Sequence, residues 1–190
     1  MKRIFAHMII AGSVLMTLAG AAQAQLGQPT KSSISIKVGG YFPSNSSARD
    51  NGGSTQLSAG IDYAVPSTGG NSTTSLPSVY FDYNGGSKNG GHVNTYGVGF
   101  AVRSAASSSS APAKMGFSPY VGIGTGYYEV QVKNNTVKPS VSGSGGSFGG
   151  KIFAGLNLSS NFFIEANYQL ISSRKGVNPS GFGVQLGARF

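Results

Sequence analysis

The residue types that most often perform catalysis or bind metals are scarce in this chain. Its 190 residues include two His, five acidic residues and no Cys. Outside the first 24 residues the one His is His92, in Gly-Gly-His-Val-Asn, with no acidic residue near it in sequence. A general base needs a partner to orient it, and a metal site needs a cluster of His, Cys or carboxylate ligands. We therefore expect no catalytic residue, no metal and no cofactor.

A glycine-rich segment, residues 143–150, is a second candidate for chemistry. Its sequence is Gly-Ser-Gly-Gly-Ser-Phe-Gly-Gly. Phosphate-binding loops of this composition continue into Lys-Ser or Lys-Thr and then into a helix. Neither feature follows here, so the segment is predicted to be a flexible loop.

The charge balance is strongly basic. The formal net charge is +9. Without Lys2 and Arg3, which fall in a segment that we expect to be removed, 12 basic minus 5 acidic residues leave +7. An excess of this size is compatible with an anionic surface as a partner. Nucleic acid is disfavoured, because the basic residues are not interleaved with aromatic ones.

Residues 1–24 have the organisation of a secretory signal peptide. Lys2 and Arg3 form a basic start, residues 8–18 are largely apolar, and Ala22-Gln23-Ala24 supplies a cleavage site before Gln25. No later segment is apolar over the roughly 20 residues that a membrane-spanning helix needs. If the mature chain spans a membrane, it must do so as a closed barrel.

After residue 25 the sequence alternates between turn-rich tracts and runs in which every second residue is apolar. That period is typical of β-strands with one apolar face. The chain beyond the signal shows no convincing helix. Eight such runs predict an all-β protein, an eight-stranded antiparallel transmembrane β-barrel, as one domain over residues 25–190. The runs cover residues 34–42, 57–65, 79–83, 96–102, 117–132, 148–158, 162–170 and 182–190.

The residues between the apolar positions are small or polar, and seven charged residues share this second face. An outer-membrane barrel turns such a face inward, whereas a soluble barrel turns it to water. The signal peptide and the aromatic residues near the strand ends favour the membrane form, with a soluble secreted β-protein as the alternative. The predicted interior charges are Lys37, Asp62, Asp82, Arg103, Lys151, Glu165 and Arg189, and the predicted girdle residues are Tyr41, Phe42, Tyr83, Tyr96, Tyr127, Tyr128, Phe162 and Phe190.

Three segments carry a resemblance to a known class. They are residues 119–128 (PYVGIGTGYY), 161–168 (NFFIEANY) and the last strand, 181–190 (GFGVQLGARF). The mature chain resembles the small outer-membrane barrels of the OmpA/OmpX/OmpW-like class of Gram-negative bacteria. The resemblance implies a location in the outer membrane among lipid and lipopolysaccharide, and a last strand that the barrel assembly machinery reads. The assembly-signal residues are Phe182, Val184, Leu186 and Phe190.

The class also implies an orientation, with both chain ends in the periplasm. Residues 43–54, 84–92, 133–146 and 172–180 then become extracellular loops, and 66–77, 104–116 and 159–161 become periplasmic turns. Enzymes of this class use a His with Ser and acidic partners. His92 is not part of a His-x-Ser motif, and no acidic residue lies near it in sequence. The basic residues of the predicted loops either bind lipopolysaccharide phosphates or another anionic ligand, or are solvated without a dedicated partner. They are Arg49, Lys88, Lys133, Lys138, Arg174 and Lys175.

The interior charges have two interpretations. They line a selective pore, or they pair with one another and fill the lumen. Eight strands enclose a space just wide enough for side chains, which favours the filled lumen, although the interior glycines leave room for water. We expect a non-enzymatic barrel of the cell envelope with a structural or surface-interaction role. A narrow, porin-like transport barrel for small solutes is the alternative.

Overall fold

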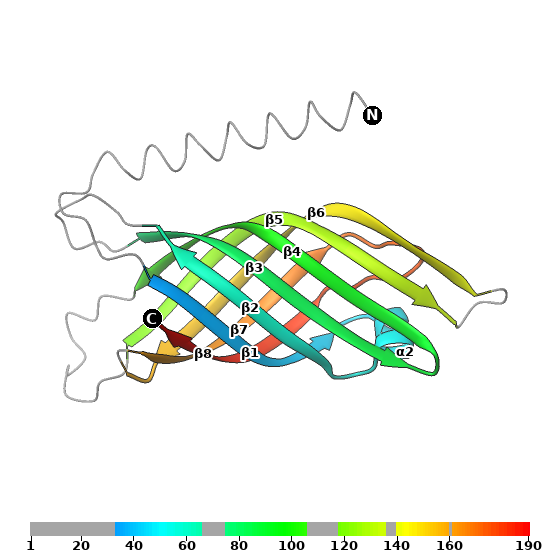
Figure 1. Ribbon diagram of the computed structural model, residues 1–190, viewed down its shortest axis with the longest axis horizontal. Helices are drawn as coiled ribbons and strands as arrows, with labels where there is room; N and C mark the ends of the chain where they lie inside the picture. The colour runs from blue at the N-terminus through cyan, green and yellow to red at the C-terminus, as the bar shows by residue number, and fades with distance from the viewer. Residues whose placement is uncertain (1–32, 66–74, 106–117, 136–139, 160) are drawn as a thin grey trace, which may run out of the picture.

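A computed structural model describes residues 33–65, 75–105, 118–135, 140–159 and 161–190 (Figure 1). The predicted signal peptide, residues 1–24, lies outside this part of the chain. Eight antiparallel strands form a closed barrel in which each strand pairs with its neighbours in sequence and β1 pairs with β8. The predicted fold class is confirmed. The strands are β1 (Ser33–Pro43), β2 (Gln56–Ala64), β3 (Ser75–Lys88), β4 (Gly91–Ala105), β5 (Ser118–Asn134), β6 (Val141–Asn157), β7 (Phe162–Ile171) and β8 (Gly181–Arg189).

The apolar face of the strands points outward. Large apolar side chains around the barrel are 37–76% exposed, which is far beyond what a soluble surface tolerates as one continuous belt. In an outer-membrane barrel this belt faces lipid. None of the helices among the described residues is long and apolar enough to cross a membrane. Representative residues of the belt are Ile36, Leu57, Phe100, Ile123, Ile152 and Leu186.

The two ends of the barrel differ. The start of β1 and the C-terminus lie at one end, which we call the terminal end, and a short helix, α2 (Ser46–Gly52), lies at the other, the α2 end (Figure 1). At the α2 end the strands continue further than predicted. β3 and β4 run up to a two-residue turn at Asn89 and Gly90, both with positive φ. This arrangement suits the right-handed twist of a hairpin.

The predicted loops 84–92 and 133–146 are therefore mostly strand. The glycine-rich segment 143–150, predicted to be a flexible loop, belongs to β6, where it pairs with β5 from Val141 onward. Its Gly and Ser residues lack the apolar alternation that marks a strand, so the segment is specified by its partner strand. Pro77, in the predicted turn 66–77, lies inside β3.

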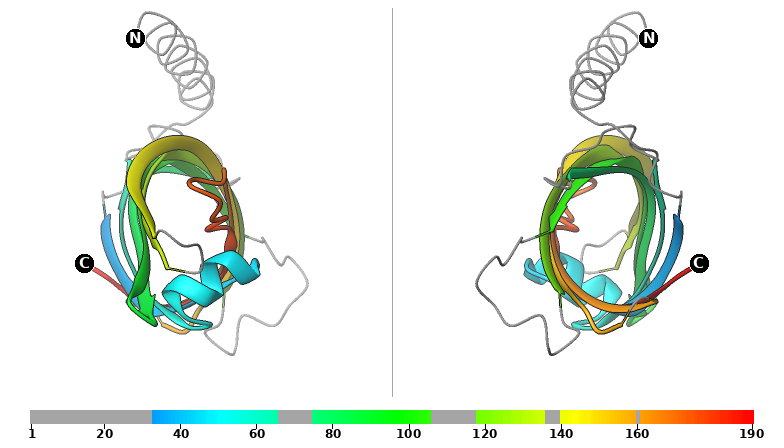
Figure 2. Two further views of the ribbon diagram at one scale, coloured as in Figure 1. Left: turned by 90° about the vertical axis from the view of Figure 1, so that its right-hand side faces the viewer. Right: turned by 90° about the vertical axis from the view of Figure 1, so that its left-hand side faces the viewer.

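Helix α2 was not predicted from the sequence. Asn45 is its N-cap and accepts a hydrogen bond from the Ser47 backbone N–H at 3.0 Å. Seven residues are too few for a stable isolated helix, so α2 depends on packing, and its Ala48 and Asn51 are fully buried. Seen along the barrel axis, α2 lies over one side of the barrel end (left view of Figure 2).

The inner face contains large rings as well as small and polar residues. Tyr41 and Tyr128, predicted to lie in the interface girdle, are buried in the lumen. Their neighbours in sequence face outward. Because side chains alternate between the two faces of a strand, both rings face inward. Interior glycines sit opposite such rings, so these glycines do not leave space for water. The other buried rings are Tyr80, Tyr120, Phe153 and Phe163.

Candidate functional site in the lumen and at the α2 end

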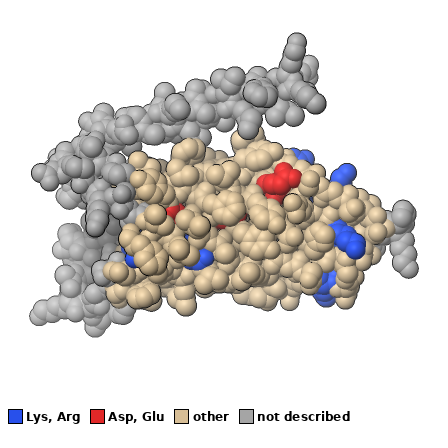
Figure 3. All heavy atoms as spheres, in the orientation of Figure 1, with Lys and Arg blue, Asp and Glu red and all other residues tan. Residues whose placement is uncertain are grey.

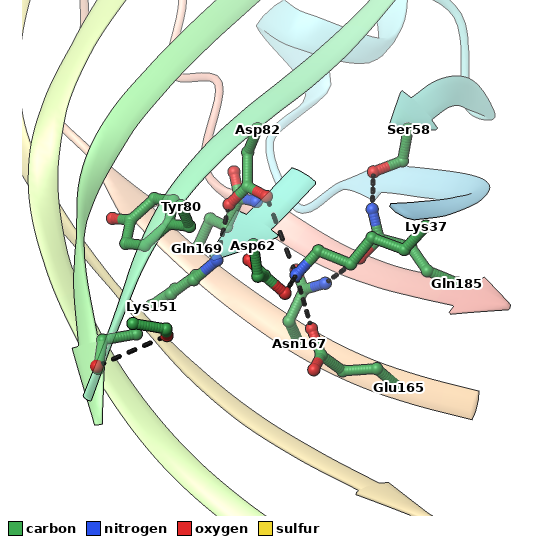
Figure 4. Close-up of polar contacts among 12 residues, drawn as sticks. Lys37, Ser58, Asp62, Tyr80, Asp82, Lys151, Glu165, Asn167, Gln169 and Gln185 are labelled. Carbon is green, nitrogen blue, oxygen red and sulfur yellow. Dashed lines mark hydrogen bonds and ion pairs between the residues drawn. The ribbon is translucent and has the colours of Figure 1, made fainter. Parts of the chain in front are cut away.

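Lys37 is the centre of the charged cluster in the lumen (Figure 4). Its Nζ donates to Glu165 Oε1 at 2.9 Å, lies 3.0 Å from Asp62 Oδ2 and 3.8 Å from Asp82 Oδ1. These four side chains are at most 6% exposed. Four strands, β1, β2, β3 and β7, contribute one side chain each, so the ion pairs connect separate walls of the barrel.

Lys151, on β6, extends the cluster across the lumen. Its Nζ donates to Asp82 Oδ2 at 2.7 Å and lies 3.5 Å from the centre of the Tyr80 ring. The Tyr80 hydroxyl is 3.0 Å from that of Tyr128. Buried charges persist only when they are paired, and here two ammonium groups together with the Arg103 guanidinium balance three carboxylates.

Amide and hydroxyl side chains form a second layer beside the ion pairs. Ser58 Oγ donates to Asn84 Oδ1 at 2.7 Å, and Asn84 Nδ2 donates to Gln169 Oε1 at 2.8 Å. Gln185 Nε2 donates to Ser58 Oγ at 2.8 Å, and Gln185 Oε1 accepts from Asn167 Nδ2 at 3.2 Å. All five residues are at most 3% exposed, so these hydrogen bonds join β2, β3, β7 and β8 inside the barrel.

Arginines and aromatic rings form a layer nearer the terminal end. Arg103 Nη2 is 3.7 Å from both Asp62 and Glu165, and its guanidinium lies 4.5 Å from the centre of the Tyr120 ring. Arg189 lies 4.6 Å from the centre of the Phe163 ring. Among the described residues Arg189 has no carboxylate within ion-pair distance. Cation–π contacts replace an ion pair for this arginine.

Apolar side chains are buried inside the α2 end of the barrel. Ala48 of α2, Val93, Val130, Val132 and Val177 are each at most 1% exposed and belong to the cluster of buried apolar residues. Hydrogen bonds attach α2 to two further connections. Asn51 Oδ1 accepts from the Asn135 backbone N–H at 2.9 Å, and Ser47 Oγ accepts from that of Asn178 at 3.2 Å.

The seven predicted interior charges are thus found on the inner face of the barrel. The structure brings six of them together as ion pairs and leaves Arg189 on the aromatic layer. His92 is half-buried on β4, opposite Ser87 and Lys133 in register. Within the described part of the chain no carboxylate pairs with it, and no three metal-ligating side chains are grouped.

Four of the six predicted basic loop residues are exposed at the α2 end. Arg49, Lys88, Lys133 and Lys175 are exposed, and Lys and Arg side chains are visible at this end in Figure 3. Arg174 differs, because it is partly buried and donates to the carbonyl of Gly146 on β6. Lys138 lies outside the described residues.

The predicted assembly-signal residues lie on the outside of β8. Phe182, Leu186 and Phe190 are 43%, 60% and 76% exposed, and Val184 is half-buried between them. The inward-facing positions of β8 include Gly183, Gln185 and Gly187. The backbone of Phe190 pairs with Ile34 of β1, which closes the barrel at its last residue.

The buried rings are the lumen residues that the sequence analysis missed, whereas the polar amides lie on the face predicted to be interior. A signal was present for the rings that share a strand with an interior charge, because each of these rings lies an even number of residues from that charge. Tyr80 is two residues from Asp82, Phe153 two from Lys151, and Phe163 two from Glu165. A period-two pattern that places the charge inside also places the ring inside.

The barrel, its lipid-facing belt and its polar lumen define a small outer-membrane β-barrel protein. The chain belongs to the outer membrane protein beta-barrel domain family, whose model matches residues 11–190. This confirms the predicted class and its location in the outer membrane.

Solved structures agree with this fold. Neisserial surface protein A is 14% identical with a TM-score of 0.61, over 85% of this chain and 97% of its own. Ail, the attachment invasion locus protein of Yersinia pestis, is 19% identical with a TM-score of 0.53, over 84% of this chain and 97% of its own. At these identities the similarity concerns the fold alone. No curated protein sequence matches the chain.

Proposed function

We propose that the protein is a non-enzymatic, non-conducting barrel of the outer membrane whose function lies at its α2 end, on the outside of the cell. The observation that carries this proposal is the ion-paired lumen. Lys37 joins Asp62 of β2 to Glu165 of β7 at 2.9–3.0 Å, and Lys151 of β6 reaches Asp82 of β3 at 2.7 Å. A solute would have to separate these pairs, and breaking a buried pair costs about 3–5 kcal/mol.

The basic side chains of the α2 end supply the surface role. Arg49, Lys88, Lys133 and Lys175 are exposed, and Asp50 is the exposed acid among the described residues of this end. An excess of one charge sign attracts ligands of the other sign and raises their rate of association. The proposed ligands are therefore anionic molecules, such as the phosphates of lipopolysaccharide or an acidic polymer on another surface.

Two measurements test the proposal. The mature protein in planar lipid bilayers should show no ion conductance, and steady conductance steps would favour the narrow transport barrel instead. In nanodiscs, the protein should bind dextran sulfate but not uncharged dextran. Replacing the four basic residues together by Gln should raise the half-saturating concentration at least about tenfold at low salt, and an unchanged value would refute the surface role.

A further inference from the structure

The pairing of β6 leaves one long strand edge open. On one side β6 pairs with β5 along its whole length, from Val141 to Asn157. On the other side its pairing with β7 begins only at Gly149. Within the described part of the chain, residues 141–148 therefore have a strand neighbour on one side alone. The β5–β6 hairpin extends beyond the neighbouring β7 and β8 in Figure 1.

The open edge stands clear of the membrane. Tyr127 and Phe148 contact each other on the outer face, with ring centres 5.7 Å apart, at the level where an aromatic girdle marks the interface. Residues 141–147 continue past this level towards the α2 end. Their backbone groups are consequently in water or available to a partner, and not in lipid.

The backbone groups of alternate residues face the open edge. In an antiparallel strand, consecutive residues direct their N–H and C=O groups to opposite sides. The Gly146 carbonyl accepts from Arg174, which comes from the β7–β8 connection on the open side. Ser142, Ser144 and Phe148 share the parity of Gly146, so their N–H and C=O groups also point to this side.

Two cations border the edge. The Arg174 side chain lies along Gly145, and its Nε is buried with no hydrogen-bond partner among the described residues. The Lys175 side chain lies beside Gly143. The acid near this segment is Glu129 on β5, opposite Gly146 in register. An unpaired strand edge is a template for another strand, and this one carries net positive charge.

We propose that the open edge of β6, Ser142–Phe148, docks an extended acidic segment of a partner protein, which adds to the sheet as a further antiparallel strand. This inference rests on the proposed surface role and names its partner class. A second copy in the same membrane is a poor occupant, because both β6 strands descend towards the membrane and cannot run antiparallel. The small Ser and Gly side chains leave both faces of the edge accessible, and Arg174 and Lys175 select carboxylates.

The test uses the mature protein in nanodiscs and a fluorescent octapeptide of alternating Glu and Val, with binding followed by anisotropy. Two further peptides carry N-methyl groups, one on the even and one on the odd residues. One of the two should lose binding at least tenfold and the other should keep it, since only one set of N–H groups faces β6. A peptide with Lys in place of Glu should bind at least tenfold more weakly. Equal binding of the two N-methylated peptides would refute strand addition.

Variants of Ser144 provide the matched control on the protein. Ser144→Pro removes an N–H that faces the open edge and no bond to β5, and should weaken binding of the acidic peptide at least tenfold. Ser144→Ala keeps the N–H and should bind as the wild type does. If Ser144→Pro binds normally while the fourfold Gln variant loses both dextran sulfate and peptide, the edge proposal fails and the surface role stands. If the protein conducts ions and ignores dextran sulfate, the proposed function itself fails.

Discussion

Replacing Lys37 by Met should lower the free energy of unfolding of the barrel by about 3–5 kcal/mol, the usual cost of removing one partner from a buried ion pair. Met has nearly the shape of Lys without its charge, so packing changes little. In the variant, Asp62 and Glu165 keep only Arg103, at 3.7 Å from each. Asp82 keeps Lys151 at 2.7 Å. Two buried carboxylates therefore lose their nearest cation.

The loss can be measured by urea unfolding of protein refolded in lipid. Far-ultraviolet circular dichroism is the suitable signal, because the chain has no Trp. A decrease of 3–5 kcal/mol corresponds to a change of roughly 10²–10³·⁵ in the unfolding constant, since about 1.4 kcal/mol is a factor of ten. Lys88→Met is the matched control, because Lys88 is exposed, and it should stay within about 0.5 kcal/mol of the wild type.

A double variant separates the ion pair from packing. Adding Glu165→Gln to Lys37→Met removes one of the two stranded carboxylates, so the double variant should be more stable than the sum of the single losses predicts. The reasoning would be refuted if Lys37→Met destabilised the barrel no more than Lys88→Met. It would also be refuted if the two lumen substitutions were strictly additive, because the charges would then not be coupled.

Three further predictions concern other parts of the molecule. Gly187→Ala should destabilise the barrel by about 1–3 kcal/mol in urea unfolding, since its Cβ would overlap the Phe163 ring. Adding Phe163→Leu should partly restore stability. Gly40→Ala is the control and should have no effect, because its Cβ would meet only atoms at 3.4 Å or beyond. Asn51→Ala leaves the Asn135 N–H without its acceptor, and hydrogen exchange should speed up in α2 while the β7–β8 ladder keeps its protection. Phe190→Ala should reduce the amount that reaches the outer membrane in cells, yet the purified variant should refold in detergent with heat-modifiable mobility; normal insertion in cells would argue against an assembly signal in β8.

Alternation in the sequence was sufficient to predict the barrel where the strands carry apolar residues. The run at 57–65 corresponds to β2 (Gln56–Ala64), and that at 162–170 to β7 (Phe162–Ile171). It failed where a strand consists of Gly and Ser, as in the first half of β6, because pairing with β5 and not local composition makes that segment a strand. Helix α2 was missed for a similar reason, since tertiary contacts hold it and it has no apolar periodicity.

The sequence predicts which charged residues face the lumen, but not which of them contact one another. Parity alone places Lys37, Asp82 and Glu165 on the inside. Which carboxylate meets which ammonium depends on strand register and on contacts across the barrel, and neither is encoded by spacing within one strand. Tyr41 and Tyr128 were misassigned because an aromatic residue near a strand end has two uses, at the membrane interface and in the lumen. Their parity decides between these uses.

The interior glycines and rings form one packing system, and this system connects the composition of the chain to the buried rings of its interior. Each of five buried rings stands directly opposite a glycine on the neighbouring strand, where a Cβ would collide with the ring. A shift of register by two residues would set Phe163 against Gln185 or Arg189, and Tyr120 against Phe153 or Asn157, in place of glycine. These two pairs therefore help to fix the β5–β6 and β7–β8 registers, and the second of these helps to place Glu165 beside Lys37. The same glycines that suggested an open, hydrated pore are thus the reason that rings can fill it. The pairs are Tyr80–Gly99, Tyr120–Gly155, Tyr128–Gly97, Phe153–Gly122 and Phe163–Gly187.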